Sequence, residues 1–174
     1  VSKVRYEKIQ NKISKQKREN INNYKVTEEV KDIRDWKVVE DETTLGRSAS
    51  ISAYASGDAK SVVWMISPPI DLSGLSQPYF AFRSAVKYGD KSKLEVLIST
   101  DFGGTTDGKI ANWKKLDLKI ASRMDGNNIW IDSGNFYLEH FQNEKVHFGF
   151  RYTGSGKSTY DATFFVDDIR VVEN

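Results

Sequence analysis

Beyond residue 35 the chain alternates between short apolar runs and polar turns. The apolar runs are rich in β-branched and aromatic residues, and clusters of Gly, Ser, Asn and Asp separate them, which is typical of strands joined by turns. The pattern predicts nine strands, at Trp36–Glu40, Ser48–Tyr54, Ser61–Ser67, Tyr79–Lys87, Lys93–Thr100, Trp113–Leu118, Ile129–Asp132, Lys145–Thr153 and Thr159–Val172. Apart from the N-terminal segment, only Phe136–Gln142 looks helical.

Several of these strands alternate with period two, so that each has one face suited to a core. In the strand at 145–153, for example, Val146, Phe148 and Phe150 alternate with polar residues and a glycine. Too few helices are predicted to serve as crossovers between parallel strands. We therefore expect residues 33–174 to form an all-β domain, an antiparallel β-sandwich of the jelly-roll type, with Trp36, Trp64 and Trp113 in packing positions.

Residues 1–32 are predicted to be a basic linker or a marginal helix preceding this domain. Residues 1–35 carry a net charge of +4, whereas the rest of the chain sums to −2. The apolar stripe of the segment, made of Tyr6, Ile9 and Ile13, is thin, and Glu7 and Glu19 interrupt its cations. A nucleic-acid partner or an anionic membrane would need clustered cations with aromatic or apolar support, so we expect neither.

Composition narrows the chemistry further. The 174 residues are 39% hydrophobic and 12% aromatic, which is typical of a folded domain, and no cysteine is present for a disulfide, a thiolate metal site or a nucleophile. No stretch approaches the roughly 18 to 20 apolar residues that cross a bilayer. The first residue is Val1, so a signal peptide or a lipid anchor upstream of it stays open as an expectation.

No motif predicts catalysis. The run Arg151–Ser158 resembles a phosphate-binding loop but has an arginine in place of the first glycine and is followed by strand-forming residues, which favours a hairpin loop. His140 and His147 lie beside no nucleophile and have no metal-binding spacing. Hydrolysis by two carboxylates stays open, since no pair stands out, but we expect a protein that is not an enzyme.

The final predicted strand contains two adjacent aspartates, Asp167 and Asp168, among apolar residues. With period two, one of them must point among apolar side chains. That carboxylate would have to accept backbone hydrogen bonds, meet an arginine, or bind a hard cation such as Ca²⁺ with other acids. Glu40, Asp41 and Glu42 could supply those acids if the first and last strands are neighbours.

At this point a family resemblance is visible. The runs that carry it are Trp64–Leu72 (WMISPPIDL), Leu94–Asp101 (LEVLISTD), Trp113 with Leu116, Phe148–Gly154 (FGFRYTG) and Phe165–Val171 (FVDDIRV). Together they resemble choice-of-anchor J domains, which are related to the cleaved-adhesin domains of bacterial surface proteases and similar to galactose-binding-like jelly rolls. The resemblance spans residues 33–174. It implies a secreted or surface-attached jelly roll, frequent in lipoproteins and polysaccharide-handling systems of Bacteroidetes and usually without catalysis.

The resemblance also bears on a metal. In cleaved-adhesin relatives, calcium is held partly by acids near the first strand and in the terminal strand. Only Asp167 with Asp168 carries over cleanly, while Glu40 and Asp41 occupy the first region without the family's spacing. The resemblance thus implies a structural Ca²⁺ held by these four residues.

For function, we expect a non-catalytic extracellular module that binds carbohydrate or a surface glycoconjugate. Tyr88, Trp130 and Tyr160 lie next to turn or polar residues, where a ring can stack on a sugar while a neighbouring Asp or Asn binds its hydroxyls. The alternative is a structural or accessory domain of a larger cell-surface protein, whose partner is a surface protein and which binds no small ligand.

Overall fold

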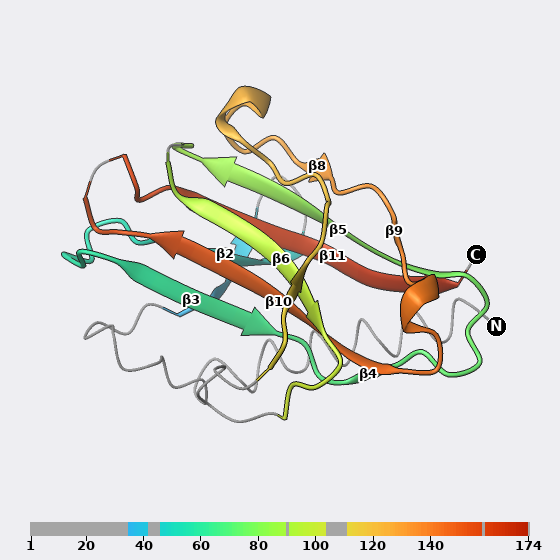
Figure 1. Ribbon diagram of the computed structural model, residues 1–174. Helices are drawn as coiled ribbons and strands as arrows, with labels where there is room; N and C mark the ends of the chain where they lie inside the picture. Colours follow the sequence, from blue (N-terminus) through green and yellow to red (C-terminus); the bar gives the residue numbers. More distant parts are fainter. Residues whose placement is uncertain (1–34, 42–45, 90, 104–110, 158, 174) are drawn as a thin grey trace.

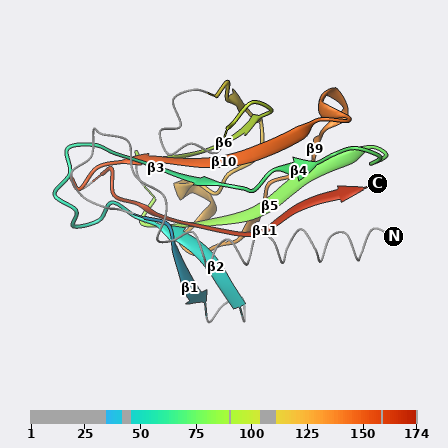
Figure 2. The ribbon, with the colours of Figure 1, turned by 90° about the horizontal axis from the view of Figure 1, so that it is seen from below.

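A computed structural model describes residues 35–41, 46–89, 91–103, 111–157 and 159–173. These residues form two antiparallel sheets packed face to face, as Figures 1 and 2 show. The predicted β-sandwich is therefore confirmed. The segment predicted as a linker, residues 1–32, lies outside the described residues.

The larger sheet has six strands. Their order is β1 (Lys37–Asp41), β2 (Gly46–Ile51), β11 (Thr163–Glu173), β5 (Pro78–Lys87) and β8 (Ile131–Asp132), and β9 (Phe136–Tyr137) also pairs with β5.

The smaller sheet has five strands and forms the front layer in Figure 1. Their order is β3 (Ser61–Ile66), β10 (Lys145–Gly154), β6 (Lys93–Ser99) and β7 (Lys114–Lys115), and β4 (Ile70–Asp71) also pairs with β10.

The core lies between the two sheets and is dominated by phenylalanines at alternate positions. Phe80 of β5 stacks on Phe148 of β10 with ring centroids 3.9 Å apart, and Phe82 meets the edge of Phe150 at 5.1 Å. All four rings are at most 2% exposed. Burying each such ring stabilises the fold by about 1.5–3 kcal/mol, which explains why the period-two pattern decides the architecture.

Of the three tryptophans assigned to packing, only Trp36 lies in this core. Trp64 and Trp113 are partly exposed on the outward face of the five-stranded sheet. The prediction failed to distinguish the two sides of a strand because a large ring fits either side when a small residue lies beneath it.

All nine predicted strands are present, with ends shifted by a few residues. The predicted strand at Trp113–Leu118 contracts to the two residues of β7. The predicted helix at Phe136–Gln142 is wrong: β9 occupies its first two residues, and a 3-10 helix, η2, spans only Glu139–Phe141. Two-residue strands such as β4 and β9 form because a longer neighbouring strand offers backbone groups that need hydrogen-bond partners. Their own sequences therefore show little strand pattern. A second 3-10 helix, η1, spans Arg123–Asp125.

The two aspartates of β11 flank a β-bulge. Asp167 pairs with Arg83 of β5, but the next pair joins Arg170 to Ala81, so β11 carries one extra residue. Asp168 has a φ of 49°, in the left-handed region that aspartate tolerates better than most residues. The extra residue shifts the alternation, so that Phe164 and Val166 before the bulge and Ile169 after it are all buried, while both aspartates stay partly exposed. The prediction that one aspartate points among apolar side chains is therefore wrong.

One end of the sandwich, at the left in Figure 1, gathers the described parts of three connections: residues 52–60, then 88–89 with 91–92, and 155–157 with 159–162. The run Arg151–Ser158 is predicted to be a hairpin loop, but its first four residues belong to β10. The connection after them crosses between the layers, because β10 and β11 belong to different sheets. This connection passes very close to residues 56–58, because a Cβ on Gly156 would collide with the Gly57 nitrogen. Among the described residues, no helix has the length and apolar character needed to cross a membrane.

Candidate ligand-binding cleft

A hollow of about 590 Å³ opens where these three connections meet β1 and the ends of β2 and β11. A second hollow of about 510 Å³ adjoins it, and Tyr88 and Asp161 line both. We call the two together the tyrosine cleft. The first hollow is lined by Asp35, Lys37, Val39, Ser50, Ile51, Ser52, Tyr54, Tyr88, Asp161 and Thr163. The second adds Gly89, Arg123, Gly126, Asn127 and Thr159.

Two exposed aromatic rings line the first hollow. Tyr54 is 70% exposed and Tyr88 is 66% exposed, although each ring carries enough apolar surface to be buried at little cost. Tyr88 has a φ of 57°, and its backbone N–H donates to Asn127 Oδ1 at 2.9 Å. Non-glycine residues in this backbone region are uncommon and gather at functional sites. Thr159, in the second hollow, is a stronger outlier, with a φ of 81° in a β-branched residue.

Hydrogen bonds between the connections hold the walls of the cleft in place. Ser52 Oγ donates to the backbone oxygen of Asp161 at 3.0 Å and accepts the Tyr54 N–H at 3.1 Å. The buried hydroxyl of Tyr152 accepts the Ala53 N–H at 3.2 Å and donates to the Ala162 oxygen at 3.3 Å. The strand end that carries Tyr54 is thereby fixed against the segment that carries Asp161, before any ligand arrives.

The polar groups of the cleft have mixed charge. Burial raises the pKa of Asp35, and the charge of Lys37 offsets this only in part. Lys87 Nζ lies 5.0 Å from the ring centroid of Tyr88, and the Tyr88 side chain is largely exposed to solvent. Carboxylate, amide and hydroxyl groups around exposed rings suit a ligand that is rich in hydroxyls and has flat apolar faces.

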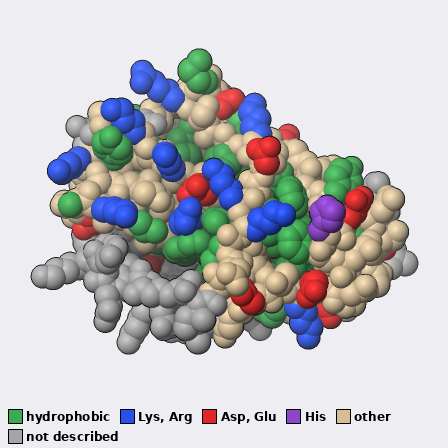
Figure 3. Space-filling view, viewed as in Figure 1, with side chains coloured by type: hydrophobic (Ala, Val, Ile, Leu, Met, Phe, Trp, Pro, Cys, Tyr) green, Lys and Arg blue, Asp and Glu red, His purple; other side chains and the backbone are tan. Residues whose placement is uncertain are grey.

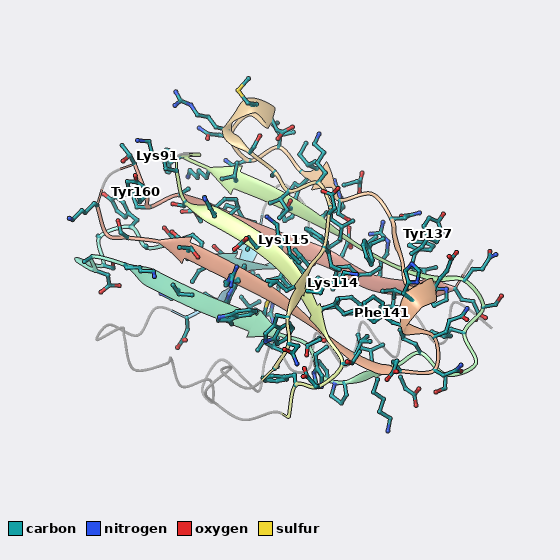
Figure 4. The ribbon with its side chains drawn as sticks, in the orientation of Figure 1. Lys91, Lys114, Lys115, Tyr137, Phe141 and Tyr160 are labelled. Carbon is teal, nitrogen blue, oxygen red and sulfur yellow. The ribbon has the colours of Figure 1, made fainter. Side chains whose placement is uncertain are left out.

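The structure brings two of the three predicted ligand-binding residues to the same end of the molecule. Tyr88 lines both hollows, and Tyr160, 42% exposed, lies beside Asp161 with Lys91 Nζ 5.7 Å from its ring centroid. Figure 4 shows Lys91 and Tyr160 together at that end. Trp130 lines neither hollow. It lies partly exposed on the six-stranded sheet, where the guanidinium of Arg83 stands 5.8 Å from its ring centroid.

Tyr54 is a cleft residue that the sequence did not reveal. It was placed at the end of a predicted strand, and β2 stops three residues before it. The available signal was an aromatic residue just before an Ala-Ser-Gly-Asp turn.

The four predicted calcium ligands do not form one group among the described side chains. Strand β2 lies between β1 and β11, which sets the first and last strands about 10 Å apart. Glu40 pairs with Arg47 at 3.3 Å and Asp168 with Arg83 at 3.6 Å, so Asp168 meets an arginine, one of the predicted alternatives. Within the described ranges, no cluster of three or more acidic or histidine side chains could hold a metal. The side chain of Asp41 lies outside them, and the calcium site stays a prediction.

No protein-family model matches the sequence, and no curated protein is similar to it. Several solved structures resemble the fold at low identity. The K3 cleaved adhesin domain of Lys-gingipain from Porphyromonas gingivalis is 12% identical with a TM-score of 0.44, covering 75% of this chain and 76% of its own. The family 11 carbohydrate-binding module of a cellulosomal cellulase from Clostridium thermocellum is 11% identical with a TM-score of 0.47, covering 83% and 84%.

A third similar structure is a carbohydrate-binding module of family 28, specific for non-crystalline cellulose, at 11% identity and a TM-score of 0.42, covering 80% and 82%. One of these structures is a cleaved-adhesin domain, and no family match supports the choice-of-anchor J assignment. Similarity at this level transfers neither a ligand nor an activity to this chain.

Proposed function

We propose that the protein is a non-catalytic, extracellular or surface-attached carbohydrate-binding module and that the tyrosine cleft binds an uncharged oligosaccharide. The observation that carries the proposal is the pair Tyr54 and Tyr88, both about two-thirds exposed and both lining one hollow. A pyranose ring offers an apolar face to such a ring and hydroxyls around its rim. The volume of about 590 Å³ falls within the range of sites for small ligands.

The polar lining of the cleft supports an uncharged ligand over an acidic one. In the lining of the first hollow two acids, Asp35 and Asp161, outnumber the one cation, Lys37. They would repel a uronate or a sulfate, but they accept hydrogen bonds from sugar hydroxyls. Because the connections are already tied together by hydrogen bonds, little conformational entropy is lost when the ligand binds.

A glycan array probed with the full chain tests the proposal, followed by calorimetric titration of the best oligosaccharide. Tyr54→Ala and Tyr88→Ala should each weaken binding about tenfold, since the loss of one stacked ring costs about 1–1.5 kcal/mol. Tyr137→Ala is the matched control: this ring is 49% exposed and lies at the far end of the sandwich in Figure 4, so its loss should leave binding unchanged.

The same assay distinguishes the other functions. Since two carboxylic acids line the cleft, release of reducing sugar is measured as well, and the proposal expects none. An empty glycan array combined with capture of a defined surface-protein partner would support the accessory-domain alternative. Binding that survives in both tyrosine variants would remove the cleft as the site.

A further inference from the structure

A second cluster of aromatic side chains lies on the outward face of the five-stranded sheet, away from the tyrosine cleft. We call it the tryptophan face and define it by Trp64, Phe102, Trp113 and His147. Trp64 and Trp113 have ring centroids 5.1 Å apart, Phe102 lies 5.5 Å from Trp113, and His147 meets Phe102 at 5.1 Å. All four side chains are partly exposed. The face is thus a continuous aromatic surface outside the core.

A glycine lets the two indole rings lie against the sheet. Gly149 of β10 has no side chain, and a Cβ added there would stand 3.0 Å from both Trp64 and Trp113. Gly149 pairs with Leu97 of β6, and both positions face outward. Because the strands on either side of β10 carry larger residues there, the glycine leaves room for the rings. The rings are therefore held by the backbone beneath them, and their outer surfaces contribute to the protein surface.

Around Glu95, on the part of the face formed by β6 and β10, cations outnumber acids. Arg151 stands over Trp64, with its guanidinium 5.3 Å from the ring centroid, and it binds Glu95 at 2.6 Å. Lys115 binds the same carboxylate at 3.4 Å with a side chain that is 64% exposed. Lys93, exposed and two residues from Glu95 on the same side of β6, adds a third cation. Two cations therefore share the single charge of Glu95, and Lys93 adds a further positive charge to this part of the face.

Lys114 does not add to these cations. It pairs with Ile98, a core residue, so it lies on the opposite side of the sheet from Lys115, and its Nζ lies 6.0 Å from the ring centroid of Phe141. Figure 3, which views this face, shows apolar surface across its centre, with Lys and Arg side chains around it and Asp and Glu side chains among them. Two acids lie toward the other end of the face: Asp71 belongs to β4, and Asp101 precedes Phe102 and accepts hydrogen bonds from Asn112, the neighbour of Trp113.

We propose that the tryptophan face is a second binding site, for an acidic polysaccharide that carries carboxylate groups, such as a polyuronate chain. The indole rings stack on the apolar faces of its sugars. Arg151 neutralises Glu95, so the charges of Lys115 and Lys93 are left to pair with the carboxylates of the ligand. This chemistry differs from that of the tyrosine cleft, whose lining has mixed charge: Asp35 and Asp161 with Lys37 and Arg123. The two sites therefore bind different glycans and are tested separately.

Affinity electrophoresis of the full chain in gels containing polygalacturonate tests this site, with the methyl-esterified polymer as the uncharged counterpart. Retardation is expected with the acid form, not with the ester, and it should weaken as the salt concentration rises. The double variant Lys93→Gln/Lys115→Gln should lower the affinity about fivefold, the effect of losing two exposed ion pairs, while Arg151 still neutralises Glu95.

The control is Arg47→Gln/Arg170→Gln, which removes the same charge from the six-stranded sheet and should leave the affinity unchanged. Tyr88→Ala should also leave it unchanged, so failure of the tyrosine cleft and failure of this site give different results. The proposal is overturned if polygalacturonate does not retard the chain, or if both double variants weaken binding equally. It is also overturned if a single-stranded oligothymidylate of equal charge binds more tightly than polygalacturonate.

Discussion

The hydroxyl of Tyr152 links the core to the walls of the tyrosine cleft, and its removal is a sharp test of that link. Tyr152 lies on β10 with no exposed surface. Its hydroxyl accepts the N–H of Ala53 and donates to the oxygen of Ala162, and both of those residues are also fully buried. Tyr152→Phe removes one oxygen atom, keeps the ring, and leaves these two backbone groups without that partner.

The expected magnitude follows from the burial of those groups. A buried donor or acceptor that loses its hydrogen bond costs about 1–3 kcal/mol, and the ring itself still fits its site. We therefore expect the free energy of unfolding to fall by about 2 kcal/mol, out of the roughly 5–15 kcal/mol typical of a domain. For a chain of this size the midpoint of thermal unfolding should fall by roughly 6 °C.

Urea unfolding followed by tryptophan fluorescence measures the stability, and titration with the best oligosaccharide from the array measures the affinity. Both should fall in Tyr152→Phe, because the freed segment at Ala53 carries Tyr54. Tyr137→Phe is the matched control, since that residue is 49% exposed and its hydroxyl can bond to water. Its unfolding free energy should change by less than about 0.5 kcal/mol.

Two results would refute this reasoning. If Tyr152→Phe unfolds like the parent protein, the hydroxyl does not satisfy the two backbone groups. If the variant loses stability but keeps its affinity, the cleft does not depend on the link between Ala53 and Ala162.

Three further predictions concern other parts of the fold. Gly149→Ala should lower the midpoint of thermal unfolding and shift the tryptophan emission, because the added methyl group meets two indole rings at 3.0 Å; unchanged emission would contradict the packing. Burial raises the pKa of Glu95, but hydrogen bonds and charge from Arg151 and Lys115 outweigh it, so that the pKa lies below its ordinary value of 4.5. Its ion pairs therefore stabilise the fold above about pH 4.5 and are lost as the pH falls further, so the difference in melting temperature between the parent and Glu95→Gln should shrink between pH 7 and pH 3. If the predicted Ca²⁺ binds, millimolar calcium should raise the melting temperature relative to chelator, and equal melting temperatures would dismiss it.

The strands and their inward faces could be predicted from the sequence because burial acts on every second residue. Phe80, Phe82, Phe148 and Phe150 alternate with less apolar neighbours, and these four rings meet in the core. The assignment of strands to sheets could not be predicted, because it depends on pairings between distant segments. The crossing of residues 155–162 from one sheet to the other leaves no local signal.

The bulge in β11 and the tyrosine cleft were missed for related reasons. Strict alternation assumes one residue per partner, and the extra residue at Asp168 reverses the faces beyond it. Tyr88 and Tyr160 were recognisable as aromatics beside turns, but nothing local indicates that Tyr54 lies in the same hollow as Tyr88. A site built from three connections becomes visible only when the sheets place their ends together.

The most direct test of the central claim is an amide chemical-shift titration of the isotope-labelled chain with the oligosaccharide that the array selects. The account predicts that the largest shifts fall on residues 52–54, 88, 127 and 160–163, which surround the tyrosine cleft. The account is contradicted if this uncharged sugar shifts mainly the amides on the outward face of β3, β10 and β6, or if it shifts none.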